Sequence, residues 1–410
     1  MGSGGWGGSA GTSKPVSGFD VAIFPRALEG LRSHSTAKES LDLRALHLFL
    51  YAVSEKQDMD LQRLLEKKLS LLSGQILGPE FLASLAGGDL FSQVAAAAKL
   101  LFDAFSVLRL DHLRESGFKL IDFLDGFYDE KLGAFVDPKK TGAAFAFQNA
   151  VGARAFLSAY PHLQNPQIRD KAGNALNFIR EKLYDPLLGL INRFPPESET
   201  LEYGRLADCA VSILALTDAY LQSGDKSYRD FADILAKYLL QDLWDREKGG
   251  FLPHSRAEPS QEKVSKETLS SNAAAFEALW RLGYLKGQNA YFKWADLGLH
   301  RFLDEKNPEA EASFAHILDM RSRGRIELEI VGRAEEEVSQ RMLETLATLY
   351  APRKIISFIN PDDQDYILAH GLDAESYPRL FGCVNLKRCA DTPNSDRESV
   401  SRVLNAAWHC

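Results

Sequence analysis

The stretch Tyr203–Phe251 reads YGRLADCAVSILALTDAYLQSGDKSYRDFADILAKYLLQDLWDREKGGF, and it decides the fold. Its first half carries apolar residues at helical spacing, until Ser223–Asp225 interrupts the pattern as a tight turn between helices requires. A second amphipathic run follows, with Phe231 and Leu235 on one stripe, and two glycines before Phe251 end it. The stretch therefore predicts a helical hairpin, in which two antiparallel helices are joined by a short turn.

Parts of this hairpin recur along the chain at a nearly constant spacing. The segments Tyr128–Gly133, Tyr184–Gly189 and Trp244–Gly249 each begin with an aromatic residue and Asp, and each ends with Gly. Such self-similarity is typical of arrays whose units bury their apolar faces against one another. Extending the period predicts six hairpins, near 38–73, 88–127, 142–184, 203–244, 265–304 and 311–350.

Six helical hairpins can close into a ring or stack into an open solenoid. The less regular first and last hairpins leave the solenoid open as the alternative. We predict the ring, an all-α (α/α)6 toroid, because no polar capping hairpin stands at either end of the array. In a closed ring the first hairpin must touch the last.

The chain outside the array has a different pattern. Residues 1–37 are expected to be a Gly-rich lead-in, 38–324 the toroid, and 325–410 a small C-terminal α/β extension that completes the last hairpin. Residues 325–331 alternate as a strand does, and 354–359 and 379–384 resemble two more strands. Helices are expected between these strands, at 335–349 and 364–370.

Composition excludes several classes of function. A net charge of −8 argues against a nucleic-acid-binding protein, and no apolar run reaches the ~18 residues of a membrane helix. The N-terminal residues do not have the pattern of a signal peptide, so we expect a cytoplasmic protein. Its four cysteines are too few for a disulfide scaffold and lack zinc spacing. We therefore expect reduced, structural thiols, no metal and no cofactor.

The lengths of the connections place a site at one end of the ring. Turns inside the hairpins are short, whereas the connections 129–141, 185–202 and 245–267 between hairpins are long. In an up-and-down ring all long connections lie at one end, together with the N-termini and unpaired N–H groups of the inner helices. Long connections without structure of their own are usually functional. We therefore predict a cavity mouth at this long-loop end.

The polar and aromatic residues expected at this mouth suit a sugar, whose apolar face stacks on aromatic rings and whose hydroxyls bind charged groups. Paired carboxylates there suit the hydrolysis of a glycosidic bond, and a His with a Glu suits an epimerase. The predicted catalytic residues are Asp208, Glu267 and His254. The predicted substrate-binding residues are Asn149, Glu202, Tyr203, Arg205, Phe251, Ser271 and Asn272.

Each candidate also has a simpler interpretation. Glu202 belongs to a polar loop in which a carboxylate is ordinarily solvated, and Glu267 suits the positive end of a helix dipole. Ser271 and Asn272 are typical of the start of a helix. Asp208 is the most informative acid, because a carboxylate near the start of an inner helix points toward the ring.

Several segments together resemble the spermatogenesis-associated-protein-20-like family. The resemblance rests on Asp208–Ala210, Leu243–Phe251, Ser270–Ala275 and Gly382–Cys389, and it covers roughly residues 200–405 well. It implies a six-hairpin, glycosidase-like toroid, related in fold to sugar epimerases and fused to a thioredoxin-like domain. The family's activity is largely unassigned.

The chain departs from that family in two respects. We expect the thioredoxin-like partner domain to be missing, so no redox function carries over. Before Asn149, where the family usually shows His-Phe-Glu-Lys, this chain reads the mostly apolar Gly142–Gln148. The resemblance therefore implies only Asn149, Asp208, Ser271 and Asn272 as cavity positions.

These observations lead to two hypotheses of different classes. The first is a six-hairpin glycosidase-like protein that binds or acts on a carbohydrate, as a hydrolase or an epimerase, through the long-loop cavity. The second is a non-catalytic binding or scaffold protein that has lost the catalytic groups. Both expect a small carbohydrate-like ligand at most, with neither nucleic acid nor membrane as a partner.

Overall fold

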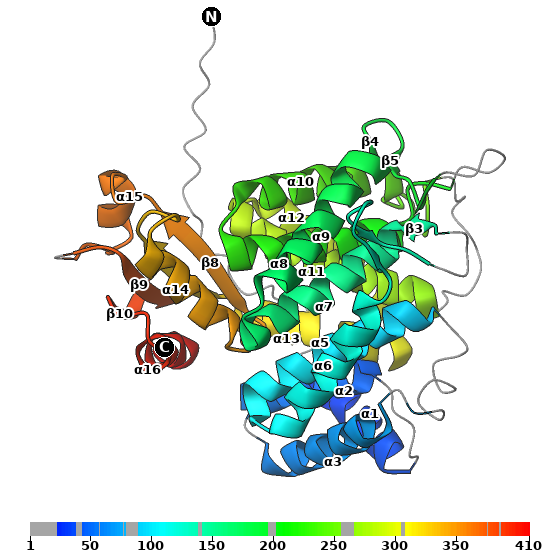
Figure 1. The fold of residues 1–410 in the computed structure, drawn as a ribbon, viewed down its shortest axis with the longest axis horizontal. Helices are drawn as coiled ribbons and strands as arrows, with labels where there is room; N and C mark the ends of the chain where they lie inside the picture. The colour runs from blue at the N-terminus through cyan, green and yellow to red at the C-terminus, as the bar shows by residue number, and fades with distance from the viewer. Residues whose placement is uncertain are drawn as a thin grey trace, which may run out of the picture.

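The computed structural model describes residues 23–37, 43–56, 58–76, 78, 89–137, 142–195, 202–255, 266–304, 308–374, 376–384 and 387–410. Helices dominate this part of the chain, and they form a body that carries a small mixed sheet at one side (Figure 1). The prediction of an (α/α)6 toroid with a C-terminal α/β extension is confirmed.

The inner wall of the ring consists of helices that each contact the next one. In the described chain they are α2 (Leu43–Lys56), α5 (Leu90–Leu108), α7 (Ala146–Leu163), α9 (Leu206–Ser223), α11 (Lys266–Lys286) and α13 (Pro308–Arg323). Contact between α13 and α2 closes the ring, and the Tyr51 hydroxyl donates to Asp319 Oδ2 across this seam at 2.8 Å. The predicted contact between the first and last inner helices is confirmed.

Outer helices cover the inner wall. Each of the following packs on the inner helix that precedes it: α3 (Met59–Gln75), α6 (Asp111–Asp125), α8 (Pro166–Phe178), α10 (Lys226–Tyr238) and α12 (Asn289–Asp304). Single π-helical turns, η2 (Ile179–Leu183) and η3 (Leu239–Leu243), extend α8 and α10.

The outer partner of α13 differs from the prediction. Helix α1 (Ile23–Ala37) packs there, although residues 1–37 were expected to be a lead-in. Phe24 and Ala27 are buried, and the Phe24 ring meets the Tyr51 ring edge-on at 5.6 Å. The ring therefore includes elements before residue 38. The extension does not complete the last hairpin, so the expected sixth hairpin at 311–350 is wrong.

The repeated aromatic-Asp…Gly segments form the first turns of the long connections. Strands β1 (Tyr128–Asp129) and β2 (Ala134–Phe135) pair across the first of these turns, and β4 (Tyr184–Asp185) and β5 (Gly189–Leu190) pair across the second. In all three copies the Asp carboxylate accepts hydrogen bonds from the backbone N–H groups two and three residues later. The glycine that closes each turn has φ between 68° and 78°, a conformation that favours glycine. The sequence repeat is thus a turn motif.

The extension is a four-stranded sheet with helices. Its strands are β7 (Ile326–Val331), β8 (Lys354–Ile359), β9 (Arg379–Val384) and β10 (Lys387–Thr392), in the order β10-β9-β7-β8. Strands β7 and β8 are parallel and are joined through α14 (Glu337–Ala347), while the other pairs are antiparallel. The three predicted strands are confirmed, and so are the two helices between them, α14 and α15 (Gln364–Ala369). The sequence analysis did not predict β10 or α16 (Arg397–His409).

The extension covers the end of the ring opposite the long connections (Figure 1). Helix α14 contacts α7 and α9, and β8 contacts α9 and α11. At the end of α9, Gly224 lies against the Phe358 ring of β8, and a Cβ there would come within 2.7 Å of that ring. Arg353 forms ion pairs with Glu55 of α2 at 2.8 and 3.1 Å. These contacts fix the extension at the short-turn end.

The cysteines correct one expectation. Cys389 and Cys410 form a disulfide with a Cα–Cα distance of 6.2 Å, which ties the end of α16 to β10. Cys209 and Cys383 are free and buried, and burial raises the pKa of Cys383 to about 12. The expectation of four reduced thiols is therefore wrong, because the fold brings the last residue beside β10. The two cysteines are 21 residues apart in the sequence, and this spacing alone does not predict that they pair.

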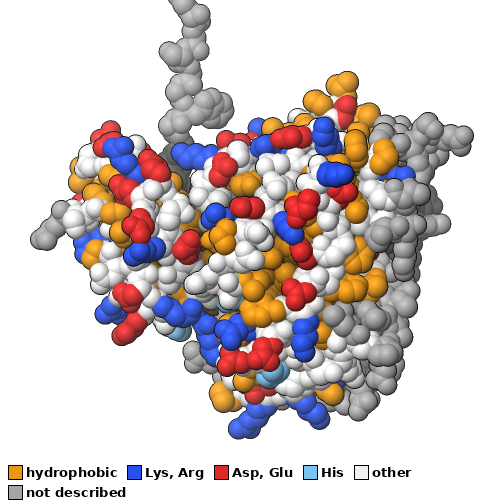
Figure 2. Space-filling model, viewed as in Figure 1, with side chains coloured by type: hydrophobic (Ala, Val, Ile, Leu, Met, Phe, Trp, Pro, Cys, Tyr) orange, Lys and Arg blue, Asp and Glu red, His pale blue; other side chains and the backbone are white. Residues whose placement is uncertain are grey.

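One described helix, α5, is long and apolar enough to cross a membrane by composition alone. Its residues Val94, Ala97 and Leu101 are fully buried between neighbouring ring helices, as expected of a core helix. Acidic and basic side chains are interspersed over the face shown in Figure 2.

Candidate functional site

Two of the predicted substrate-binding residues hold the connections to the ring. Asn149 of α7 donates its amide to Phe135 O and Phe145 O, both at 2.9 Å, and accepts from Phe135 N at 2.8 Å. Asn272 of α11 makes the same set of bonds with Phe251 and with Thr268 O. Both asparagines are fully buried. Their amides are occupied by the backbone, so the role that the structure gives them is to fix the loops.

Asp208 lies in the first turn of α9 and is also buried. It accepts a hydrogen bond from the Asn192 amide at 3.1 Å. Burial raises the pKa of Asp208 to about 6, against the opposing effects of Arg205 and of that hydrogen bond. A carboxyl in this state exchanges its proton near neutral pH, as a general acid must.

The other predicted residues are distributed around Asp208. Arg205 pairs with Glu202 at 3.8 Å, with the Arg205 side chain 41% and the Glu202 side chain 65% exposed. The Arg205 backbone pairs with that of exposed His254, and the Tyr203 backbone pairs with that of Ile191. The long-loop end thus brings together Glu202, Tyr203, Arg205, Asp208 and His254.

Two predicted residues, Phe251 and Ser271, do not join that group, and a third, Glu267, has no described side chain. Phe251 is only 2% exposed and packs edge-on against Trp244 at 5.2 Å, so the structure shows it as a core residue. Ser271 is half-buried on α11. The side chain of Glu267 lies outside the described residues.

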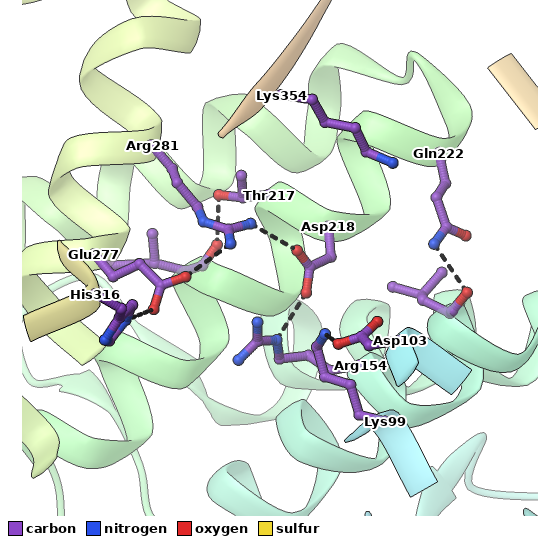
Figure 3. Close-up of polar contacts among 12 residues, drawn as sticks. Lys99, Asp103, Arg154, Thr217, Asp218, Gln222, Glu277, Arg281, His316 and Lys354 are labelled. Atoms are coloured by element: carbon purple, nitrogen blue, oxygen red, sulfur yellow. Dashed lines mark hydrogen bonds and ion pairs between the residues drawn. The ribbon is translucent and has the colours of Figure 1, made fainter. Parts of the chain in front are cut away.

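A second polar cluster lines the inside of the ring, and the sequence analysis missed it (Figure 3). It runs across the inner helices as a chain of ion pairs. Arg154 of α7 meets Asp218 of α9 at 2.7 Å, and Asp218 meets Arg281 of α11 at 3.4 Å. Arg281 pairs with Glu277 one helical turn earlier at 2.8 Å, and Glu277 meets His316 of α13 at 3.2 Å.

Lys99 and Asp103 of α5 add a further pair at 2.5 Å. We call these seven residues the lumen cluster: Lys99, Asp103, Arg154, Asp218, Glu277, Arg281 and His316. They come from five of the inner helices, and in Figure 3 their side chains point toward one another across the ring. Outer helices pack on the other face of each inner helix, so this face has no helix to bury it.

The lumen cluster is deep and yet retains exposed surface. Its side chains are 15–30% exposed, although they lie in the interior of the ring. They are therefore half-buried, and each keeps part of its surface free of packed side chains. Polar side chains at these positions make the fold less stable than apolar ones would, because apolar side chains here would form a continuous core.

The cluster keeps its acids ionised. Burial alone would raise the pKa of Glu277, but Arg281 and His316 outweigh it and hold that pKa well below its usual range. Arg154 and Arg281 likewise outweigh burial at Asp218 and lower its pKa. The pKa of His47 of α2 is lowered to about 4, mainly by burial and further by the positive charges of Lys99 and Arg154. The lumen thus offers ionised carboxylates, arginines and a neutral His47.

A sequence signal for this cluster exists. Asp218 is the only charged residue between Cys209 and Gly224, in a helix that is otherwise almost entirely buried. A single charge in the middle of a buried helix has to be paired or functional. The sequence analysis considered the long connections and the helix starts, and it therefore did not select Asp218.

The described residues contain no group of three or more His, Cys, Asp and Glu side chains that could hold a metal ion. The acids of the lumen cluster are each paired with a cation, as the distances above show.

Comparison with known proteins gives the fold a name. No protein-family model and no curated protein sequence matches the chain. Solved structures do match. The unsaturated glucuronyl hydrolase of Bacillus sp. GL1 aligns with a TM-score of 0.56 at 12% identity, over 71% of this chain and 85% of that one. The chain has the six-hairpin glycosidase fold.

Two other similar structures differ from that hydrolase in their activities. The GH76A α-1,6-mannanase of Salegentibacter sp. HEL1_6 has a TM-score of 0.54 at 9% identity, over 74% of this chain and 99% of that one. A D-mannose isomerase has a TM-score of 0.51 at 16% identity, over 64% and 74%. Six-hairpin folds thus carry both hydrolysis and isomerisation. At identities this low, structural similarity shows only the fold of this chain. Its chemistry has to be argued from its own residues.

Proposed function

We propose that this six-hairpin protein binds and acts on a carbohydrate inside its ring, by an isomerase- or epimerase-like proton transfer. The observation that carries the proposal is the Glu277–His316 pair, whose atoms lie 3.2 Å apart on neighbouring inner helices. The His316 side chain is 30% exposed, and in this proposal its other ring nitrogen faces the ligand. A histidine held by a carboxylate is a common general base and acid.

The proposal gives each member of the pair a role. Glu277 remains ionised, so it accepts a hydrogen bond from His316 Nε2 and fixes the ring's orientation and tautomer. His316 Nδ1 then takes a proton from the carbon next to the carbonyl of an open-chain sugar. The electron pair moves to the carbonyl oxygen and forms an enediolate, and the proton returns to a different position or face.

The arginines of the lumen cluster suit the charge that develops in this step. Arg281 contacts Glu277, and Arg154 contacts the next carboxylate, Asp218. Guanidinium groups held in place by carboxylates stabilise a developing oxyanion without reorganising. The lumen thus contains a base, its positioning acid and an oxyanion-stabilising group.

A specific observation favours a second candidate, glycosidic hydrolysis at the long-loop end. A glycosidase needs a carboxyl that is protonated near neutral pH, and burial raises the pKa of Asp208 to about 6. Glu277 and Asp218 are unsuited to that role, because their pKa values are lowered. In this candidate Asp208 is the acid, with His254 and Glu267 as the further catalytic residues that the sequence predicts.

The proposal places the chain near the spermatogenesis-associated-protein-20-like family, as the sequence resemblance implies. A thioredoxin-like domain remains the predicted partner. A cytoplasmic location also remains a prediction, and the disulfide Cys389–Cys410 counts against it, because disulfides persist mainly in oxidising compartments.

The test is solvent exchange at the sugar. A library of aldoses and ketoses is first screened for binding by thermal shift, and the hits are incubated with the protein in D2O. Proton NMR then measures deuterium entering the position next to the carbonyl. We expect exchange with the wild type, a loss of about 10²–10⁴-fold in His316→Gln, and little change in Asp208→Asn.

Other outcomes select the other hypotheses. Cleavage of a glycoside that is lost in Asp208→Asn and kept in His316→Gln would replace the proton-transfer proposal by the hydrolase. Hits that bind and undergo neither reaction would make the chain a non-catalytic carbohydrate-binding protein. If nothing binds, the scaffold alternative replaces the carbohydrate proposal.

A further inference from the structure

The extension contributes a lysine to the lumen. Lys354 is the first residue of β8, and its side chain extends toward Asp218 and Gln222 in Figure 3. The preceding residue fixes this position, because Arg353 binds Glu55 of α2 and donates to Gly324 O at 2.9 Å. Lys354 thus reaches the ring interior from the short-turn end.

The Lys354 ammonium group is held by backbone carbonyls and has no carboxylate partner among the described residues. It donates to Leu346 O and Leu349 O at the end of α14, both at 2.6 Å. Among the described residues it forms no ion pair with a carboxylate, and its side chain is only half-buried. Burial lowers the pKa of Lys354 to about 8, so the group is still mostly charged at neutral pH.

The charges that face Lys354 come from three inner helices. They are Lys99 and Asp103 of α5, Asp218 of α9 and Arg281 of α11. Each of these cations already has a carboxylate partner in the lumen cluster, whose four charged pairings use all three acids. Lys99, Arg154 and Arg281 balance Asp103, Asp218 and Glu277. Lys354 therefore adds one positive charge beside a cluster whose lysine, arginine and carboxylate charges balance.

Two polar atoms beside this charge lack a partner. Arg281 Nε and Gln222 Oε1 are buried and make no hydrogen bond with the described residues. A buried polar group with an unmade hydrogen bond is unfavourable, so a ligand that supplies the bond gains affinity. The Arg281 N–H group is a donor, and it suits the oxygen of an acidic group.

We infer that the lumen binds a sugar bearing an anionic group, a carboxylate or a phosphate, which is held by Lys354 and Arg281. This inference rests on the proposed carbohydrate function and narrows it to a sugar acid or a sugar phosphate. The charged end of the ligand lies toward the extension, and its carbonyl end lies toward Glu277 and His316. The extension is then part of the binding site.

Calorimetry with three probes tests this inference. D-glucuronate, D-glucose 6-phosphate and D-glucose share one ring and differ in their charged group. We expect at least one of the two anions to bind at least tenfold more tightly than glucose, and the better anion identifies the group. Lys354→Gln should weaken the binding of that anion at least tenfold and leave glucose unchanged, while Lys354→Arg should retain most of the affinity.

A matched control comes from the outer wall. Lys171 of α8 is similarly buried, but it pairs with Asp125 at 2.7 Å outside the lumen. Lys171→Gln should change no affinity. If Lys354→Gln does not fold, Arg281→Gln serves as the second variant, and we expect the same loss of anion selectivity.

The possible failures can be told apart. If glucose binds as tightly as both anions, or if Lys354→Gln behaves like Lys171→Gln, the anion inference is wrong while the carbohydrate proposal stands. If none of the three probes binds and the sugar library also gives no hit, the proposed function itself fails. Binding of inorganic phosphate alone, with no preference for its sugar ester, would also overturn the inference, because the site would then not recognise a sugar.

Discussion

The inner helices carry two layers of buried polar side chains, and the layers differ in their partners. Near the helix starts, Asn149 and Asn272 bind the backbone of the preceding connection. Further along the same helices, Arg154 and Glu277 bind only side chains from across the ring or one turn away. The first layer attaches the loops to the ring, whereas the second layer joins no loop. Burial alone therefore does not identify a functional site, and the kind of partner separates the two layers.

The strongest test of this distinction compares Asn272→Ala with Glu277→Gln, two changes on one helix. Asn272→Ala leaves the buried N–H and C=O of Phe251 without partners, and we expect a loss of about 4 kcal/mol in the free energy of unfolding. Glu277→Gln should cost less, about 1–2 kcal/mol, because Arg281 keeps Asp218 as a partner and the space is partly solvated. Urea denaturation measures both changes.

Ligand affinity should show the reverse order. Glu277→Gln should weaken the binding of a lumen ligand, and Asn272→Ala should leave it unchanged wherever the protein is folded. Equal losses of stability and of affinity in the two variants would remove the distinction between the layers.

Removing the disulfide measures how much it stabilises the extension, which covers the lumen layer at the short-turn end. Cys389–Cys410 closes a loop of 21 residues, for which chain entropy predicts about 3 kcal/mol of stabilisation. Cys410→Ser should therefore lower the stability of the extension by about this amount. Thermal melts with and without reductant measure the effect. The variant should not respond to reductant, and an oxidised wild type that is equally indifferent would show that the bond contributes nothing.

Asp208 also lies near the start of an inner helix, but it carries a carboxyl where Asn149 and Asn272 carry amides, and it binds the Asn192 side chain rather than the backbone. Its pKa is raised from 3.8 to about 6 in the folded protein, because burial disfavours the charge. The carboxyl thus contributes its full stability below pH ~4, and this contribution is lost as the pH rises through ~6. At pH 7.5 we expect Asp208→Asn to be about 3 kcal/mol more stable than the wild type.

The same difference should disappear near pH 4, where both side chains are neutral. Urea denaturation across this range of pH gives the comparison. A variant that is less stable than the wild type at pH 7.5 would show that the charge of Asp208 is favourably paired, and it would remove the argument for a general acid there.

The smallest effect is expected at the exposed rim. Glu202 pairs with Arg205 at 3.8 Å, and water reaches both side chains, so Glu202→Gln should change stability by less than about 1 kcal/mol. Its effect on lumen-ligand affinity should be equally small. If calorimetry showed that Glu202→Gln binds the ligand much more weakly, the binding site would lie at the long-loop end instead of in the lumen.

The sequence predicts the ring because its signals are local. Helical periodicity, the Ser223–Asp225 turn and the aromatic-Asp…Gly repeats each act within a few residues, and the structure shows the physical cause of each. The role of α1 was missed because its partner, α13, lies almost 300 residues away and no local signal records such a pairing. The disulfide was missed for a related reason, since only the folded sheet brings Cys410 beside Cys389.

The candidate site was predicted less well than the fold. Reasoning from connection length selected helix starts, where buried amides serve the loops. Arg154, Asp218 and Glu277 lie on three different helices, and their pairing exists only once the ring has closed. Each is visible in the sequence as a charge within a buried helix, but its partner is not.

The most direct test of the account is a crystal structure of the wild-type protein with the tightest-binding sugar of the library. The account predicts the sugar inside the ring, with polar atoms within hydrogen-bond distance of Arg154, Glu277 or Arg281. A sugar bound only at the rim, beside Asp208 and His254, would contradict it, as would a sugar on the outer surface with the lumen cluster unchanged.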